Sequence, residues 1–143
     1  MEKGIIVHVL IMNQGKILIL KRAKEGDPLK NCWDSPGGTL EDGEQPILGA
    51  KRETMEETGL ELNELRLFYC ASNLDVPKNK QFITLIFLGE THINPRSVKL
   101  NRREHGEFRW IGLNEFGDYQ VVDFVGECIS YLKRHRYLIR QKS

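Results

Sequence analysis

The sequence has few of the features that mark secreted, zinc-binding or membrane-spanning proteins. Its three cysteines, Cys32, Cys70 and Cys128, are widely spaced, odd in number and form no C-x-x-C pair. Neither a disulfide framework nor a zinc site is therefore indicated. The apolar run at residues 4–12 is too short to cross a bilayer and lacks a small-residue cleavage site. A reduced, cytoplasmic setting without a membrane partner is expected.

Net charge is also nearly absent, because 21 basic residues balance 20 acidic ones and leave a formal charge of +1. This balance gives no electrostatic case for binding nucleic acid in bulk. The exception is the end of the chain, which is locally basic through Lys133, Arg134, Arg136, Arg140 and Lys142. A solvated helix end, favoured by the helix dipole, is the ordinary interpretation of such residues.

Internal repeats and low-complexity segments are missing too. A chain of 143 residues with 40% hydrophobic residues suits one globular domain with its own core. We therefore expect a single domain over residues 1–143.

The hydrophobic pattern predicts strands and two helices. Runs rich in β-branched and aromatic residues indicate strands at 5–12, 17–20, 65–71, 82–88 and 107–111. A helix is expected over 45–58, since Pro46 suits a first turn and Gly59 a left-handed C-terminal cap. Apolar residues at helical spacing from Val121 predict a final amphipathic helix, and residues 91–105 are expected to form a long loop. The pattern predicts an α/β fold with helices on both faces of a mixed sheet.

Acidic residues are concentrated around this first helix. On the expected helix, Glu53, Glu56 and Glu57 fall within about one third of the circumference, on the face away from the packed side. Like charges at this spacing destabilise a helix by roughly 0.2–0.5 kcal/mol per pair, and the C-terminal half is unfavourable for anions. A divalent cation such as Mg²⁺, which takes carboxylate oxygens and shares them with phosphates, would offset the repulsion.

The spacing of these residues resembles the signature box of the Nudix hydrolases. The matching positions are Gly38, Glu44, Arg52, Glu53, Glu56, Glu57, Gly59 and Leu60. Seven fixed letters at roughly 7% each give a chance match of about 10⁻⁸ per window. The entry at residues 36–38 and the Glu-then-Trp pattern near Trp110 are also similar to the family's layout. Thr54 departs from it, since a large aliphatic residue is usual there, and this puts local packing in doubt.

The resemblance implies an α/β/α sandwich with a mixed β-sheet between helices, and a metal-dependent pyrophosphohydrolase that directs water at phosphorus. It implies that Glu53, Glu56 and Glu57 hold Mg²⁺ or Mn²⁺. It also implies that Glu44 and Arg52 tie the loop to the helix, while Gly38 brings backbone to the metal and Gly59 shapes the helix end.

The general base stays open among Glu53, Glu56, Glu104 and Glu107, because family members place it in the box or on a downstream loop. Glu104 is preferred as an additional catalytic carboxylate, since it lies on the expected loop.

Other residues carry two interpretations each. Arg22 could bind a substrate phosphate with its planar fork or be a solvated strand-end arginine. Trp33 could stack on a substrate base or belong to the core. His8 is expected to be a hydrogen-bonded interior or substrate-side residue rather than a metal ligand.

The substrate expectation is a nucleoside diphosphate derivative. A nucleoside triphosphate, including an oxidised deoxynucleotide, is favoured, and a nucleotide sugar such as ADP-ribose is next. An RNA 5′ end is a third candidate, motivated only by the basic tail. A non-catalytic nucleotide-sensing module is the alternative of a different class, although the intact acid set disfavours it. A homodimer also stays open.

Overall fold

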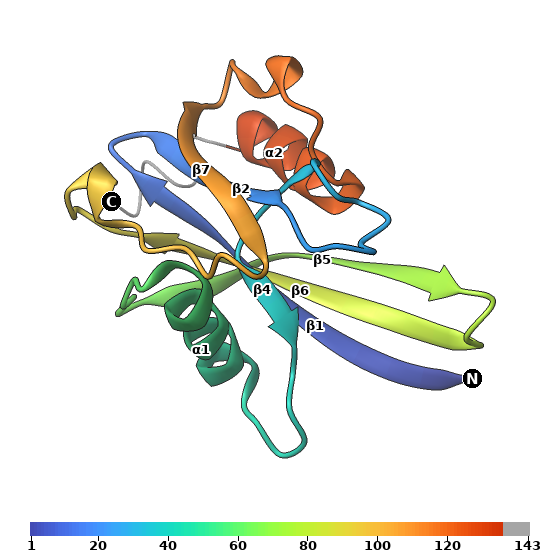
Figure 1. The fold of residues 1–143 in the computed structure, drawn as a ribbon. Coiled ribbons are helices and arrows are strands. Elements are labelled where there is room, and N and C mark those ends of the chain that lie inside the picture. The colour runs from blue at the N-terminus through green and yellow to red at the C-terminus, as the bar shows by residue number, and fades with distance from the viewer. Residues whose placement is uncertain (136–143) are drawn as a thin grey trace.

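The computed structural model describes residues 1–135 and shows a mixed β-sheet between two helices, which confirms the expected sandwich (Figure 1). The strands are β1 (Glu2–Asn13), β2 (Lys16–Arg22), β3 (Trp33–Asp34), β4 (Gly37–Thr39), β5 (Leu65–Asp75), β6 (Lys80–Glu90) and β7 (His105–Gly112). The helices are α1 (Pro46–Thr58) and α2 (Asp123–Arg134), with short 3₁₀ turns η1 (Pro95–Ser97) and η2 (Phe116–Asp118).

Strand β1 is the centre of the sheet. The order is β3-β2-β1-β6-β5, with β1 parallel to β6 over its whole length. Strand β4 pairs antiparallel with the middle of β1, so that His8 lies opposite Gly37 and Val7 opposite Gly38. Strand β7 pairs with β2. This topology brings the glycine-rich strand, the first helix and the start of β7 to one region of the molecule.

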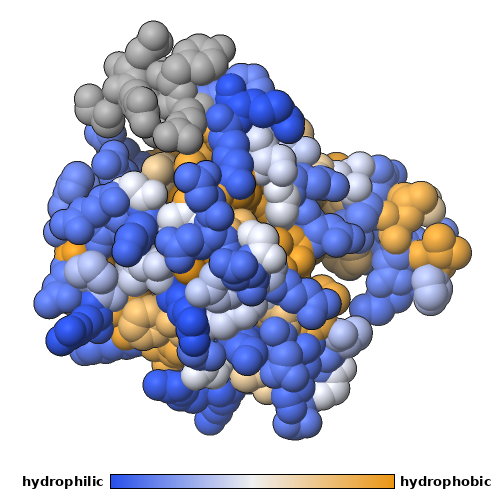
Figure 2. Space-filling model, turned by 90° about the horizontal axis from the view of Figure 1, so that it is seen from above, coloured by the Kyte–Doolittle hydropathy of each residue, from blue (hydrophilic) through white to orange (hydrophobic). Residues whose placement is uncertain are grey.

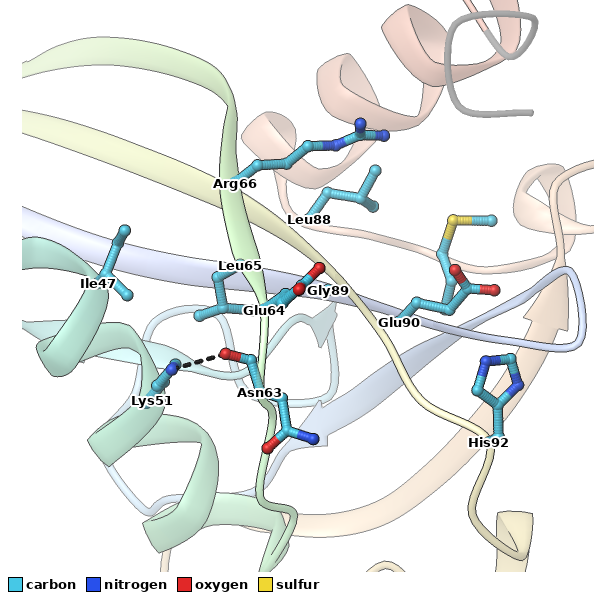
Figure 3. Close-up of a pocket in the computed structure, with 11 residues that line it drawn as sticks. Ile47, Lys51, Asn63, Glu64, Leu65, Arg66, Leu88, Gly89, Glu90 and His92 are labelled. Atoms are coloured by element: carbon cyan, nitrogen blue, oxygen red, sulfur yellow. Dashed lines mark hydrogen bonds between the residues drawn. The ribbon is translucent and has the colours of Figure 1, made fainter. Parts of the chain in front are cut away.

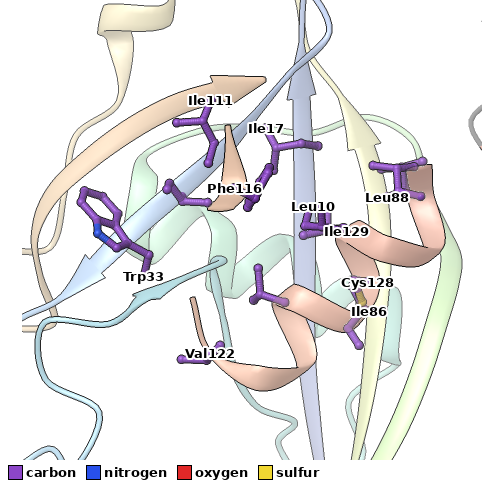
Figure 4. Packing of buried hydrophobic residues seen from close by; sticks show 13 residues of the cluster. Leu10, Ile17, Trp33, Ile86, Leu88, Ile111, Phe116, Val122, Cys128 and Ile129 are labelled. Atoms are coloured by element: carbon purple, nitrogen blue, oxygen red, sulfur yellow. The ribbon is translucent and has the colours of Figure 1, made fainter. Parts of the chain in front are cut away.

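The two faces of β1 are both buried, as its nearly continuous hydrophobicity requires. Leu10 packs on the α2 side with Val125, Cys128 and Leu132, which confirms the predicted amphipathic helix (Figure 4). The alternate residues of β1 pack on the α1 side, in a cluster that includes Val7, Val9, Ile11, Ala50 and Leu60. Each fully buried aliphatic side chain contributes roughly 1.5–3 kcal/mol to folding, so both helices are firmly attached.

Helix α1 has the predicted end and begins one residue later than expected, because Gln45 is its N-cap. Gly59 has a φ of 72°, and its N–H donates to the Met55 carbonyl at 2.9 Å. Thr54 is fully buried, and its hydroxyl donates to the Ala50 carbonyl at 2.8 Å. The polar atom is thereby satisfied, which removes the packing doubt at this position.

Three expectations were wrong in detail. The carboxylate face of α1 does not point uniformly away from the packed side, because Glu57 is buried while Leu48 and Met55 are exposed. Strands β3 and β4 were not predicted, since strands of two or three residues have no detectable period. The segment expected as one long loop contains η1 and ends where His105 begins β7.

Only part of the basic C-terminal segment lies within the described residues. Lys133 and Arg134 form the last turn of α2, whereas Arg136, Arg140 and Lys142 lie outside the described residues. No helix within residues 1–135 is long and apolar enough to cross a membrane.

Candidate active site

The site is built where the last turn of α1 meets β4. Glu57 is 6% exposed, and its Oε2 accepts a hydrogen bond from the Gly37 backbone N–H at 2.9 Å. Only glycine fits at position 37, because a Cβ there would lie 2.3 Å from the Val7 carbonyl oxygen and 2.4 Å from the His8 ring. The close approach of β4 to β1 therefore depends on the absence of a side chain.

Glu53 reaches the same strand one helical turn earlier. A Cβ on Gly38 would lie 2.6 Å from the carboxylate of Glu53, so this carboxylate rests directly over the Gly38 backbone. The two box glutamates thus converge on two consecutive glycines.

Arg52 joins the acidic loop to the helix. Its Nε and Nη2 donate to the two carboxylate oxygens of Glu44 at 2.7 and 3.0 Å. Its Nη1 donates to Glu53 at 2.9 Å and lies 3.4 Å from Glu56. The guanidinium holds the pKa of Glu44 well below its usual range, at about 2. This geometry matches the bracing role that the family resemblance implies for the pair.

Burial dominates the electrostatics of Glu57. Loss of water around the carboxylate, the largest cause, and the nearby carboxylates of Glu53, Asp34 and Glu104 together raise its pKa to about 9, although the Gly37 N–H opposes the shift. A carboxylate placed among other carboxylates is stabilised in its charged form by a cation.

A cavity of about 220 Å³ opens beside Glu57. Its lining brings together four of the predicted site residues, Arg22, Gly38, Glu57 and Glu104, and adds His8, Asp34 and His105. Asp34 and His105 were not predicted as site residues. The only signal in the sequence was their position, since Asp34 lies just before residues 36–38 and His105 directly follows Glu104.

Arg22 lies in the cavity wall with its planar fork already engaged. Its Nε and Nη2 donate to Asp27 at 2.6 and 3.1 Å, and its Nη1 donates to Asp34 at 2.7 Å. The arginine therefore anchors the loop at residues 23–31 and supplies the counter-charge for Asp34, which is 2% exposed.

Two histidines complete the wall. The Nδ1 of His8 lies 3.0 Å from the carbonyl and 3.1 Å from the hydroxyl of Ser35, and its ring packs on Phe124. His8 is thus both hydrogen-bonded and on the cavity side, as expected. The Nδ1 of His105 lies 3.4 Å from Glu57 Oε1 and has no hydrogen-bond partner within residues 1–135. Burial lowers the pKa of His105, which favours a neutral imidazole.

Other candidate residues lie outside this cavity. Trp33 is 7% exposed, belongs to the α2-side core and meets Tyr119 edge-on, so its position supports the core interpretation. Glu56 has a half-exposed side chain. Glu107 forms an ion pair with Arg109 at 2.9 Å, away from the cavity lining. Of the two downstream carboxylates, Glu104 is the better placed.

The acidic residues suit a cation that is bound jointly by the protein and the substrate phosphates better than one that is enclosed by protein ligands alone. No group of three or more His, Cys, Asp or Glu side chains within the described part of the chain forms a ready metal cage. Mg²⁺, however, usually keeps several waters and takes one or two carboxylates together with substrate phosphates. The convergence of Glu53 and Glu57 on β4 suits that mode.

A larger groove of about 780 Å³ lies on the other flank of α1 (Figure 3). It runs between Ile47 and Lys51 of the helix and the start of β5, and Lys51 donates to the Asn63 carbonyl at 2.8 Å. None of the box carboxylates that touch β4 lines it. The smaller cavity is therefore the candidate active site.

Known proteins resemble this chain over most of its length. A family model described as the NUDIX domain matches residues 2–131. The RNA pyrophosphohydrolase of Pelagibacter ubique (strain HTCC1062) is 30% identical over an alignment of 135 residues that covers 82% of this chain and 81% of that protein. The 8-oxo-dGTP diphosphatase of Buchnera aphidicola subsp. Schizaphis graminum (strain Sg) is 37% identical over 110 residues, covering 77% and 78%. The crystal structure of the MutT protein from Methanosarcina mazei Go1 superposes with a TM-score of 0.81 at 26% identity, covering 94% and 96%.

Proposed function

The chain belongs to the Nudix family and is a hydrolase of pyrophosphate bonds, and from this premise we propose that it cleaves a nucleoside triphosphate, with an oxidised deoxynucleoside triphosphate favoured. The observation that carries the proposal is the convergence of Glu53 and Glu57 on the glycines of β4, beside a cavity that also holds Glu104.

Family members typically depend on a divalent metal ion. We propose Mg²⁺ or Mn²⁺ held by Glu53 and Glu57, with the half-exposed Glu56 directly before Glu57 in the helix. Such a cation, when bound, neutralises charge on phosphate oxygens and makes water more acidic. The bare backbone of Gly38 lets the Glu53 carboxylate lie directly against β4, where a side chain at this position would displace it.

Glu104 is the proposed general base. It lines the cavity together with Glu57, and a carboxylate there accepts the proton of the attacking water. The water oxygen forms a bond to phosphorus as the bridging P–O bond breaks, and the leaving phosphate carries away the negative charge. Arg22 lines the cavity, but its guanidinium donates hydrogen bonds to Asp27 and Asp34. We therefore propose that it stabilises the cavity wall instead of binding phosphate.

The cavity is smaller than a whole nucleotide, so a free triphosphate and a longer substrate would both extend beyond it. Pockets that bury a whole small ligand usually measure about 300–1,000 Å³, so a cavity of about 220 Å³ encloses only part of a nucleotide. The Buchnera relative is named for an oxidised deoxynucleoside triphosphate, which supports the favoured class. A nucleotide sugar such as ADP-ribose ranks next.

The 5′ end of an RNA is a second candidate, favoured by the Pelagibacter relative. An RNA chain would extend out of the cavity, and the basic residues that could hold it lie mostly beyond residue 135.

A substrate panel tests the proposal. The protein is assayed with Mg²⁺ or Mn²⁺ against nucleoside triphosphates, oxidised deoxynucleotides, ADP-ribose and 5′-triphosphorylated RNA, with phosphate or pyrophosphate detection. Preference for a free triphosphate supports the proposal, and preference for RNA transfers it to the second candidate. Tight binding of one nucleotide without turnover would favour a nucleotide sensor.

We further propose that the chain works as one domain in a reducing, cytoplasmic setting. The family model spans 2–131, and Cys32, Cys70 and Cys128 form no disulfide among the described residues.

A further inference from the structure

Strand β5 leaves one edge of the sheet open. It is the last strand in the sheet order, and within residues 1–135 no strand pairs with its outer side. The strand has eleven residues, no proline, and charged side chains only at Arg66 and Asp75. Proteins usually protect such an edge with charges, proline, a β-bulge, a short strand or a covering segment, because an open edge pairs with other chains. The bulge of β5 lies between Leu67 and Tyr69, and the strand pairs regularly with β6 from Tyr69 to Asp75.

The same edge exposes large apolar side chains. Two leucines of β5 are more than half exposed, Leu67 at 57% and Leu74 at 58%. Val76, just after the strand, is 73% exposed. A bulge between Leu67 and Tyr69 shifts the register by one residue, so Leu67 and Leu74 point to the same face of the sheet although they are seven positions apart. The two exposed leucines therefore lie on one face of the sheet, one near each end of the strand.

We propose that β5 pairs antiparallel with β5 of a second copy of this chain, about a two-fold axis at Ala71. With the bulge included, Leu67 then lies opposite the partner's Leu74, and Arg66 opposite the partner's Asp75. Each contact occurs twice, because a two-fold interface uses the same surface on both copies.

Charge supports this register. Arg66 forms no ion pair or hydrogen bond within the described residues, and Asp75 has only a 4.0 Å contact with Lys78 as an ion pair. Opposite charges placed across an antiparallel pair contribute roughly 0.2–1 kcal/mol. The pairing gives each of the two side chains an oppositely charged neighbour.

Shape supports it as well. Strands β1, β5 and β6 extend beyond both helices as an arm, and the projecting end at the right of Figure 2 is hydrophobic (Figures 1 and 2). The groove of about 780 Å³ lies at the opposite end of β5, beside Leu65 and Ile47 (Figure 3). A two-fold axis at Ala71 brings the β5–β6 turn of each copy, with its exposed Val76, toward the groove of the other.

This arrangement favours a second copy over a peptide from another protein. A peptide strand would pair with the open backbone groups of β5. It would not, however, use the projecting turn and the groove at opposite ends of the strand, which a second copy brings together. Stable interfaces bury about 1,200–2,000 Å² in total, more than one strand pairing supplies, so the contact between turn and groove completes the interface.

Analytical ultracentrifugation tests the proposal, over about 1–200 µM to cover micromolar affinities. The wild-type chain of 16.6 kDa should shift to twice that mass with rising concentration. The double variant Leu67→Lys/Leu74→Lys should stay monomeric while keeping its hydrolase activity. Leu29→Lys, which is 44% exposed on the loop beside Arg22, is the control that should dimerise like the wild type.

A disulfide trap tests the register. In a Cys70→Ser background, Ala71→Cys should give a covalent dimer under mild oxidation, because facing residues across an antiparallel pair lie close enough for a disulfide. Glu61→Cys in the same background should not. A wild-type chain that stays monomeric throughout the concentration range overturns the proposal and leaves the edge to a peptide partner. A dimer unaffected by the two lysines, or not trapped at position 71, overturns it too.

Discussion

The carboxylate of Glu57 accepts a hydrogen bond from the Gly37 backbone N–H across twenty positions of sequence, at 2.9 Å. This contact joins the end of α1 to β4 and holds a buried acid at the wall of the cavity. The close approach of β4 to β1 requires glycine at position 37, whereas glycine at position 38 makes room for the Glu53 carboxylate, and this difference leads to the first prediction.

Alanine at the two glycines should have different effects. Gly37→Ala should lower the free energy of unfolding by about 3 kcal/mol, because its Cβ would meet the Val7 carbonyl oxygen, a fixed backbone atom. Gly38→Ala should cost less than about 1 kcal/mol, since the Glu53 side chain can turn away, but should reduce activity at least tenfold by displacing that carboxylate. Urea unfolding and initial rates check both. Gly117→Ala, with nothing within 4 Å, should change neither, and equal effects at positions 37 and 38 would refute the distinction.

The anchor at Arg22 should be a stability element. Arg22→Ala should lower the free energy of unfolding by about 3 kcal/mol, because Asp34 would stay buried without its counter-charge. Asp27→Asn should cost only about 1 kcal/mol, since the Asp34 contact remains and the amide still accepts a hydrogen bond. Urea unfolding measures both. An Arg22→Ala protein as stable as the wild type would show that the pair does not hold the loop.

The Glu44–Arg52 pair should make stability sensitive to acid. The pKa of Glu44 is lowered from 4.5 to about 2 in the folded chain, so its contribution is present above pH 4.5 and is lost as the pH falls toward 2. Glu44→Gln should therefore lower the melting temperature at pH 6 but flatten its decline between pH 4.5 and 2. Identical pH profiles for the two proteins would contradict the assigned pairing.

Metal binding should be visible without turnover. If the cation binds the folded chain, Mn²⁺ at about 100 times its dissociation constant should add about 2.7 kcal/mol of stability, or several degrees in melting temperature. Glu53→Gln and Glu57→Gln should each remove most of this shift, whereas Glu61→Gln, an exposed acid just past the helix, should keep it. A shift that survives both box substitutions would place the metal elsewhere.

Part of the site could be predicted from local sequence. Pro46 and Gly59 act within one helical turn, and the repulsion among Glu53, Glu56 and Glu57 follows from helix geometry alone. The burial of Glu57 could not, because it depends on β4 lying across the end of α1.

Likewise, the sequence did not indicate that the guanidinium of Arg22 would bind Asp27 and Asp34. The loop that brings these residues together has no hydrophobic period from which its path could be predicted. The short strands β3 and β4 were not predicted for the same reason. Residues brought together by tertiary contacts account for most of what the sequence did not indicate.

The most direct test of the central claim is the Mg²⁺-dependent hydrolysis of a nucleoside triphosphate by wild type and Glu57→Gln, with thermal melting as the check on folding. We predict that the variant folds and loses on the order of 10³-fold or more in kcat/KM, while Glu61→Gln stays near wild type and chelation with EDTA abolishes wild-type activity. A folded Glu57→Gln protein within a few-fold of wild-type activity, or wild-type activity unchanged by EDTA, would contradict the account.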